Sequence, residues 1–248
     1  MRRRFFIDRF DTGTATLRGD SAHHLARVLR AAPGQLYELS DGASLWLARI
    51  DRVSKSAIDF SLVEPLPVTP DRLHLTLLLS IVKFDRFEWA LEKATELGVA
   101  EIAPLAAFRS EKALVAVAGK RAARWQKILL ESAQQSRRLR PPIFHPAARP
   151  SDAFSSVGAR HGLPSAIPSV NLLLSERPAA PSLRSVLEGK WATSASLAIG
   201  PEGGWTDNEL CSALSAGFLE TSLGPTILRT ETAVIAALAS LRFALSVD

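Results

Sequence analysis

The chain has a single cysteine, Cys211, among its 248 residues. One cysteine cannot form an intrachain disulfide or a cysteine-based metal cluster. The five histidines also lack the i, i+4 spacing and the nearby acidic partner that are typical of a metal site. We therefore predict no metal, and we interpret Cys211 as a small core residue.

Long hydrophobic runs are absent as well. No stretch of about eighteen apolar residues, the length needed to span a bilayer, occurs in the sequence. The basic start at residues 1–4 is followed by Asp8 and Arg9 and not by the apolar stretch of a signal peptide. With 47% hydrophobic residues, we expect a soluble, cytoplasmic protein with one large domain or two unequal ones.

Neither a GxGxxG fingerprint nor a Walker A sequence is present, so no motif indicates a dinucleotide or a nucleoside triphosphate. The chain has instead a glycine loop at residues 200–204, directly after a short apolar run. Thr206 and Glu209 have the spacing of a capping box, and Trp205 can form a hydrophobic staple with Leu210. This stretch therefore predicts a strand, a glycine loop and a helix.

A second loop of this kind follows about twenty residues later. Residues 217–224 read as a short strand that ends in Gly-Pro, and residues 226–232 lead into an almost wholly apolar helix. In an open α/β sheet, ligands bind where the carboxyl ends of strands meet the following loops. We therefore interpret residues 200–204 and 223–230 as two walls of one pocket, with the end of a strand at 170–176 as a third. Ordinary turns remain the alternative.

The positive charge is concentrated in the middle of the chain. The net charge of +5 divides into +2 for residues 1–70, +6 for residues 71–150 and −3 for residues 151–248. The excess in the middle is mainly arginine, which binds phosphate in bidentate fashion and stacks on bases. This distribution favours a nucleic-acid partner over the alternative of a merely solvated face.

The first 65 or so residues predict a small β-rich module. Strands are expected at 3–8, 35–40, 45–50 and 57–63, with Asp41-Gly42 as a hairpin turn. Asp20 or Ser21 is expected to cap a helix that runs to about Arg30. Three prolines within residues 65–70 indicate a linker.

From residue 73 onwards, strands alternate with helices, which predicts a mostly parallel sheet covered on both faces. Strands are expected at 73–80 and 99–104. Asp85 is expected to cap the first helix with Glu88 at its N3 position, and its inward stripe is Phe87, Leu91, Ala94 and Leu97. A second helix, from about 120 to 136, should bury Trp125, Leu129 and Ala133. Residues 141–168 contain six of the fifteen prolines and predict no element.

Two motifs together, IGPEGG at 199–204 and LGPTILRTETA at 223–233, closely resemble the 16S ribosomal RNA uridine-N3 methyltransferase family. That family belongs to the SPOUT class of S-adenosylmethionine-dependent RNA methyltransferases. The resemblance continues through FDRFE at 84–88, EKATELGV at 92–99, ESAQQS at 131–136 and HHLARVLR at 23–30, so it covers nearly the whole chain. Thr226 departs from the family, which usually has arginine there. Trp205 and Glu92 replace the usual Phe and Gln without evident consequence.

The resemblance implies an α/β fold in which residues 69–248 form a knotted, mostly parallel SPOUT sheet with helices on both faces. Residues 1–68 would form a PUA-like RNA-binding barrel. It also implies a homodimer that uses S-adenosylmethionine to methylate N3 of a uridine in 16S ribosomal RNA, within the small ribosomal subunit. The alternatives are a SPOUT ribose 2′-O-methyltransferase acting on rRNA or tRNA, a non-catalytic RNA-binding protein and a nicotinamide dehydrogenase.

The resemblance and the two glycine loops together assign the site residues. The cofactor would be held by Leu174, Ser175, Gly200, Pro201, Gly203, Leu223, Gly224, Ile227, Leu228, Thr230 and Ala233. The RNA would be contacted by Arg27, Arg30, Lys83, Arg86, Arg121, Arg124, Lys127, Gln135 and Arg138.

Uracil N3 carries a proton that must leave before methylation, and a cation at a ring carbonyl would stabilise the developing anion. Arg229 is our candidate for this catalytic role. The alternative is that Arg229 only ties Glu231 or a loop carbonyl. Glu202 and Glu231 are the nearest carboxylates that could accept the proton, and the sequence does not choose between them.

Overall fold

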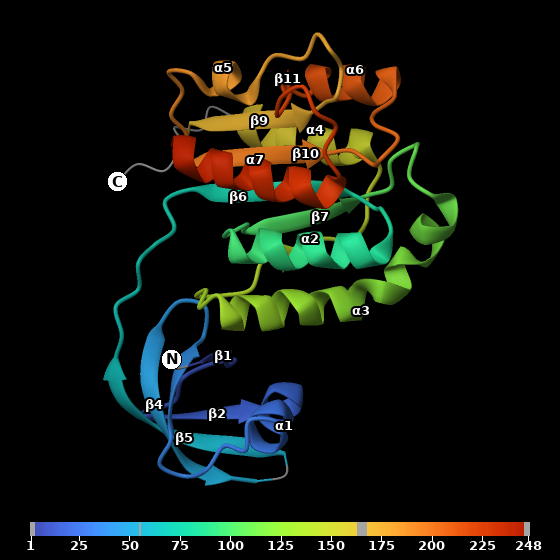
Figure 1. Cartoon of the computed structure of the whole chain (residues 1–248). Coiled ribbons are helices and arrows are strands. Elements are labelled where there is room, and N and C mark those ends of the chain that lie inside the picture. The colour runs from blue at the N-terminus through green and yellow to red at the C-terminus, as the bar shows by residue number, and fades with distance from the viewer. Residues whose placement is uncertain (1–2, 55, 163–167, 246–248) are drawn as a thin grey trace. The chain divides into compact units, whose positions relative to one another are not determined.

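The structure is a computed structural model that describes residues 3–54, 56–162 and 168–245 (Figure 1). The chain divides into two units, and the division falls within one long helix. Residues 1–70 and 131–141 form the first unit, and residues 71–130 and 142–248 form the second.

The first unit contains a short helix, the end of the long helix and a five-stranded mixed sheet with the strand order β1-β3-β4-β5-β2. Its elements are β1 (Arg4–Phe6), β2 (Thr14–Arg18), α1 (Gly19–Arg27), β3 (Leu36–Ser40), β4 (Leu45–Val53) and β5 (Ala57–Pro65). β1 pairs in parallel with β3, and the other pairs are antiparallel. Alternate residues point inward, so that Leu17, Ile50 and Phe60 meet Leu25 of α1 in a single core.

Four of the five strands were predicted from the sequence, and β2 was missed. The predicted cap of α1 was also wrong, because the helix begins at Gly19 and its N-cap, Arg18, has no side-chain hydrogen bond to the first turn. Gly19 has a φ of +67°, which allows the chain to turn from β2 straight into the helix without a capping side chain. The predicted hairpin turn is confirmed, since Asp41 accepts hydrogen bonds from the N–H groups of Ala43 and Ser44.

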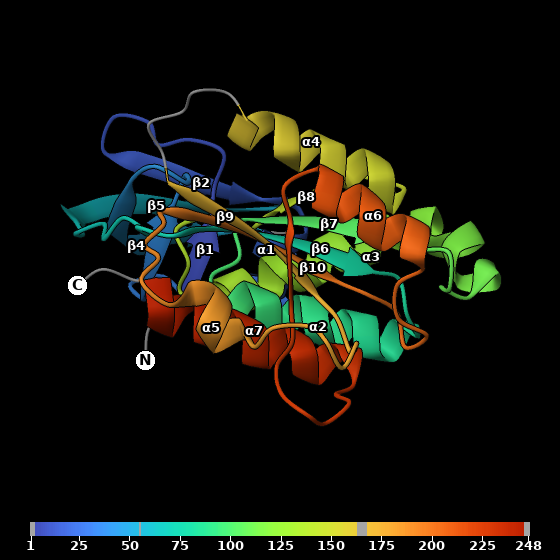
Figure 2. The same cartoon turned by 90° about the horizontal axis from the view of Figure 1, so that it is seen from above.

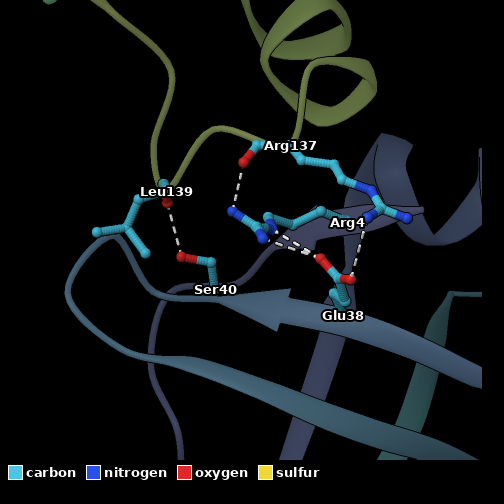
Figure 3. Close-up of polar contacts among 5 residues, drawn as sticks. All are labelled: Arg4, Glu38, Ser40, Arg137 and Leu139. Carbon is cyan, nitrogen blue, oxygen red and sulfur yellow. Dashed lines mark hydrogen bonds and ion pairs between the residues drawn. The ribbon is translucent and has the colours of Figure 1, made fainter. Parts of the chain in front are cut away.

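Residues 131–141 are bonded to the rest of the first unit through a partly buried ion pair (Figure 3). Arg4 donates to Glu38 at 2.9 and 3.1 Å and also to the carbonyl of Arg137. The guanidinium of Arg137 lies 3.9 Å from the second oxygen of Glu38, and Ser40 donates to the carbonyl of Leu139 at 2.6 Å. Arg137, which follows the long helix, therefore has a structural role in this unit.

The second unit contains a six-stranded parallel sheet with the order β11-β9-β10-β6-β7-β8. Its strands are β6 (His74–Ser80), β7 (Glu101–Leu105), β8 (Ile143–Phe144), β9 (Ser169–Leu174), β10 (Ser194–Ile199) and β11 (Leu219–Thr221). Its helices are α2 (Phe84–Glu96), most of α3 (Lys112–Gln135), α4 (Pro150–Gly162), α5 (Leu183–Leu187), α6 (Asp207–Ser215) and α7 (Thr230–Leu245). The expected α/β fold, with a parallel sheet and its helices, is confirmed.

Helices cover both faces of this sheet, with α2 and α7 on one side and α4 and α6 on the other (Figure 2). β6 shows the cause, because its side chains alternate between two hydrophobic clusters. Leu77 and Leu79 pack with α2 and α7, whereas Leu78 packs with α4 and α6. No helix in the described residues is long and apolar enough to cross a bilayer.

The predicted cap of α2 was wrong. The helix begins at Phe84, its N-cap is Lys83, and no side chain caps it. Glu88, the residue that was expected to complete a capping box, is bonded to Arg124 of α3 instead. The inward stripe is confirmed, since Phe87, Leu91 and Ala94 are fully buried and Leu97 is partly buried against the same core.

Two further differences concern helices. α3 begins eight residues earlier than expected, and α4 was missed although Pro150 occupies its first turn, a position that proline favours.

Cys211 was expected in the core but is exposed. It follows Leu210 by one residue on α6, which turns its side chain about 100° away from the buried face that carries Leu210 and Ala213.

Candidate functional site

A cavity of about 510 Å³ lies where the segments after β9, β10 and β11 meet. It is lined by residues 174–178, 199–207, 223–224 and 226–230, together with Arg109, Leu210 and Ala233. Every residue that the sequence assigned to the cofactor lines this cavity, and so does Arg229. The parallel sheet thus places the ends of three strands, which are distant in sequence, around one space.

The glycine loop after β10 is anchored at its end by the cap of the helix that follows it. Thr206 and Glu209 form the predicted capping box, in which the Glu209 carboxylate accepts from the Thr206 N–H at 2.9 Å. Trp205 belongs to the same hydrophobic cluster as Leu210, as the staple predicts. The Trp205 indole also donates to the carbonyl of Leu174 at 2.8 Å, so the loop is tied to the end of β9.

The indole of Trp205 also explains why residue 200 is glycine. A Cβ atom at Gly200 would lie 3.1 Å from the ring of Trp205, which is closer than such contacts usually are. The bare backbone of the loop therefore packs against the ring on one side while it lines the cavity on the other.

Arg109 supports the other half of the loop and was missed in the sequence. Its guanidinium donates to the carbonyls of Gly203 at 2.7 Å and Trp205 at 3.2 Å. A Cβ atom at Gly203 would lie 3.2 Å from the Arg109 Cβ. Arg109 follows β7, so the strand-end rule that identified the other walls of the cavity would have found it.

Arg86 joins two carboxylates that come from different segments of the chain, and only one of them, Glu202, lines the cavity. It donates to Glu202 of the glycine loop at 3.0 Å, and its Nε lies 3.9 Å from Glu231 in the first turn of α7. Glu231 is 8% exposed, and its Oε2 has no hydrogen-bond partner among the described residues. The sequence assigned Arg86 to RNA, whereas the structure pairs it within the chain.

Arg229 is exposed at the cavity. Its guanidinium makes no hydrogen bond and no ion pair with any part of the chain that the structure describes. The alternative in which Arg229 ties Glu231 therefore receives no support, because Glu231 faces Arg86. A cation without an internal partner can act on a bound molecule.

The other candidate RNA contacts are divided between the two units. Arg27, Arg30, Gln135 and Arg138 belong to the first unit, and Lys83, Arg121, Arg124 and Lys127 belong to the second. Arg124 forms two hydrogen bonds of 2.7 Å with Glu88, and Arg121 lies over the ring of Phe84. The hydrogen bond from Arg124 holds the pKa of the Glu88 carboxyl below its usual range, so Glu88 keeps the charge that pairs with Arg124 to lower pH than an unpaired glutamate would.

Polar side chains that the sequence did not single out also line the cavity. Glu176 and Arg177 follow β9, and Asp207 begins α6. Glu176 and Arg177 could have been found from the sequence, because they lie at the end of a predicted strand, as the residues that were assigned to the cofactor do. Their chemistry gives the cavity both carboxylates and guanidinium groups beside its apolar lining.

Residues 69–242 match the family described as the RNA methyltransferase domain. A ribosomal RNA small subunit methyltransferase E from Synechocystis sp. is 33% identical over 92% of this chain and 72% of its own length. The protein of the same name from Mycobacterium bovis is 32% identical over 94% of this chain and 88% of its own length.

Solved structures resemble the whole chain. The crystal structure of ribosomal RNA small subunit methyltransferase E from Neisseria gonorrhoeae, bound to S-adenosylmethionine, has a TM-score of 0.85 and 30% identity. This similarity covers 99% of this chain and 98% of that one. A methyltransferase structure from Legionella pneumophila, also with bound S-adenosylmethionine, has a TM-score of 0.81, 29% identity and 98% coverage of both chains.

Proposed function

The chain belongs to the RNA methyltransferase domain family, alongside the ribosomal RNA small subunit methyltransferases E, and from this premise we propose that it methylates N3 of a uridine in 16S ribosomal RNA. S-adenosylmethionine is the methyl donor in this proposal. The observation that carries the proposed chemistry is Arg229, an exposed cation at the cavity without a partner among the described residues.

The cavity fits S-adenosylmethionine in size and in chemistry. Its volume of about 510 Å³ lies within the range of about 300–1,000 Å³ that is usual for small-molecule sites. The apolar side chains of Ile199, Leu223 and Ile227 suit an adenine ring, and Glu176, Glu202 and Asp207 suit cationic groups. When bound, S-adenosylmethionine supplies a methyl group on a positively charged sulfur.

The residues of this chain would hold the donor and prepare the acceptor. The eleven cofactor residues assigned from the sequence surround the cavity, and the carbonyls of Leu174 and Gly203 are already fixed by hydrogen bonds from Trp205 and Arg109. Such prior fixing lowers the cost of ordering the site when the ligand binds.

Arg229 would donate a hydrogen bond to a carbonyl oxygen of the uracil ring and thereby stabilise the anion that forms when N3 loses its proton. Glu202 is the better candidate for the proton acceptor, because its side chain lines the cavity and that of Glu231 does not. Arg86 would keep Glu202 in position through the 3.0 Å ion pair.

We also propose the finer features that the family resemblance implies. The first unit would act as a PUA-like RNA-binding module, and the second would carry the SPOUT knot. Two copies of the chain would pair as a homodimer on 16S ribosomal RNA. The mainly arginine excess of +6 in residues 71–150 supports contact with a polyanion.

The proposed function is tested by product analysis. The protein is incubated with labelled S-adenosylmethionine and either free 16S RNA or assembled small subunits, and the labelled nucleoside is identified. We expect 3-methyluridine. A 2′-O-methylated nucleoside would overturn the proposed ring position, and transfer to neither RNA would overturn the enzyme assignment.

Replacement of Arg121, Arg124 and Lys127 by glutamine is expected to weaken RNA binding and to reduce its salt dependence. Each lost phosphate contact should reduce the magnitude of the negative slope of log K against log[salt] by about 0.9 on a duplex and about 0.7 on a single strand. Fluorescence anisotropy at several salt concentrations measures both quantities. An unchanged slope would exclude these side chains from phosphate contact.

The ion pair of Arg124 with Glu88 provides a control with the opposite sign. Glu88→Gln removes the charge that holds Arg124 and attracts Arg121, so both cations become more available to phosphate. We expect RNA affinity to rise in this variant. Affinity for S-adenosylmethionine should stay unchanged in both sets of variants, because none of these residues lines the cavity.

A further inference from the structure

The segment between β7 and α3 forms a turn that is fixed against the glycine loop. The N–H of Ser110 donates to the carbonyl of Ala107 at 3.0 Å, which places Phe108 and Arg109 at the centre of the turn. Ala107 and Ser110 are buried. The turn is therefore anchored at both of its ends.

The two central residues of this turn are bonded to the site. The N–H of Phe108 donates to Glu209 of the capping box at 2.8 Å, and Arg109 donates to two carbonyls of the loop at 2.7 and 3.2 Å. Arg109 also lines the cavity. The backbone of Phe108 thus has a defined position beside the cavity.

The ring of Phe108 is nevertheless 78% exposed. Phe84, Phe87 and Phe144 of this unit pack around Trp125, whereas Phe108, like Trp191 and Phe243, is exposed. An exposed phenyl ring adds almost no hydrophobic stabilisation to the fold. The hydrogen bonds that fix its backbone therefore hold in place a ring that the fold itself does not use.

We propose that Phe108 stacks on a nucleobase adjacent to the uridine that is methylated, an inference that rests on the proposed function. A base can enter the cavity only after it leaves its stack, and this exposes the faces of its neighbours. Aromatic side chains receive such unstacked bases in single-stranded RNA recognition. A ring whose backbone is fixed in advance loses little freedom on binding, and Arg109 supplies a positive charge beside it.

The test compares Phe108 variants in methyl transfer to small ribosomal subunits prepared from cells that lack this protein. In Phe108→Ala, the KM for small subunits should rise by about 5- to 150-fold, the loss expected when one stacked base loses its aromatic partner. The Kd for S-adenosylmethionine should not change. Phe108→Trp should retain the low KM, because it keeps an aromatic face.

Phe108→Leu separates stacking from general apolar contact, since leucine is apolar but has no aromatic face. We expect it to lose as much as the alanine variant. Trp191→Ala is the matched control, because Trp191 is also exposed, at 66%. It precedes β10 and so lies at the amino end of that strand, whereas the cavity lies at the carboxyl ends of the strands. Its KM should equal that of the unchanged chain.

A normal KM in Phe108→Ala or in Phe108→Leu, while the unchanged chain transfers methyl groups, would overturn this inference alone. If light scattering gave Phe108→Ala a different solution mass from that of the unchanged chain, the ring would belong to a subunit contact. That result would also overturn the inference. Absence of transfer by the unchanged chain would overturn the proposed function, and this inference with it.

Discussion

Replacement of Arg229 by alanine is expected to lower kcat by about 100- to 1,000-fold, the usual loss when one donor to a developing anion is removed. The Kd for S-adenosylmethionine should change little. The expectation follows from the exposed position of Arg229 at the cavity and from the absence of a partner for its guanidinium among the described residues. A cation that acts on the uracil anion works mainly in the transition state, so its loss affects turnover more than binding.

The pH dependence of this variant gives a second measurement of the same role. As pH rises towards the pKa of uridine N3, more of the substrate loses its proton without help from the protein. The loss of kcat in Arg229→Ala should therefore shrink at high pH. At each pH, calorimetry should give the variant and the unchanged chain the same Kd for S-adenosylmethionine. Equal losses in kcat and in cofactor affinity would contradict the prediction and would mean that Arg229 only holds the loop.

The walls of the cavity were predictable because each is marked by a local signal. Glycine and proline follow a strand at Gly200 and Gly224, and Thr206 and Glu209 have the spacing of a capping box. In a parallel sheet, the carboxyl ends of neighbouring strands lie at one edge. These local signals and one rule of sheet topology were therefore enough to predict that residues up to about sixty positions apart in the sequence line one cavity.

The supports of the cavity were not predictable, because they depend on pairings between distant residues. Arg86 lies 116 residues from Glu202, and Arg109 lies 94 residues from Gly203. The spacing of charges in a sequence does not show which carboxylate a given arginine will meet in the folded chain. Arg86 was therefore assigned to RNA, although in the structure it joins the glycine loop to α7.

Two different causes explain the two helix caps that were wrong. A capping side chain must be close to the first turn and free to bond there. At α1, Gly19 makes the turn by its own conformation, and at α2, Glu88 is bonded to Arg124. The capping box of α6 was predicted correctly, since Thr206 and Glu209 bond to each other.

Gly203→Val is expected to weaken S-adenosylmethionine binding by about 100-fold, which corresponds to a strongly overpacked site. One cause would be that the new side chain fills space that the ligand occupies, since Gly203 lines the cavity. The structure gives a different cause, because a Cβ atom at Gly203 would lie 3.2 Å from the Cβ and 3.3 Å from the Cδ of Arg109. The valine would displace Arg109, and the loop would lose the 2.7 Å hydrogen bond to its carbonyl.

A double variant distinguishes these two causes. Arg109→Gly removes the Cβ and Cδ atoms that crowd the valine, so the pair Gly203→Val and Arg109→Gly should bind better than the sum of the two single losses predicts. Calorimetry on the four proteins measures this coupling, and circular dichroism checks that each remains folded. If the losses simply add, the valine acts on the ligand directly. If Gly203→Val binds S-adenosylmethionine normally, the glycine loop is not a wall of the cofactor site.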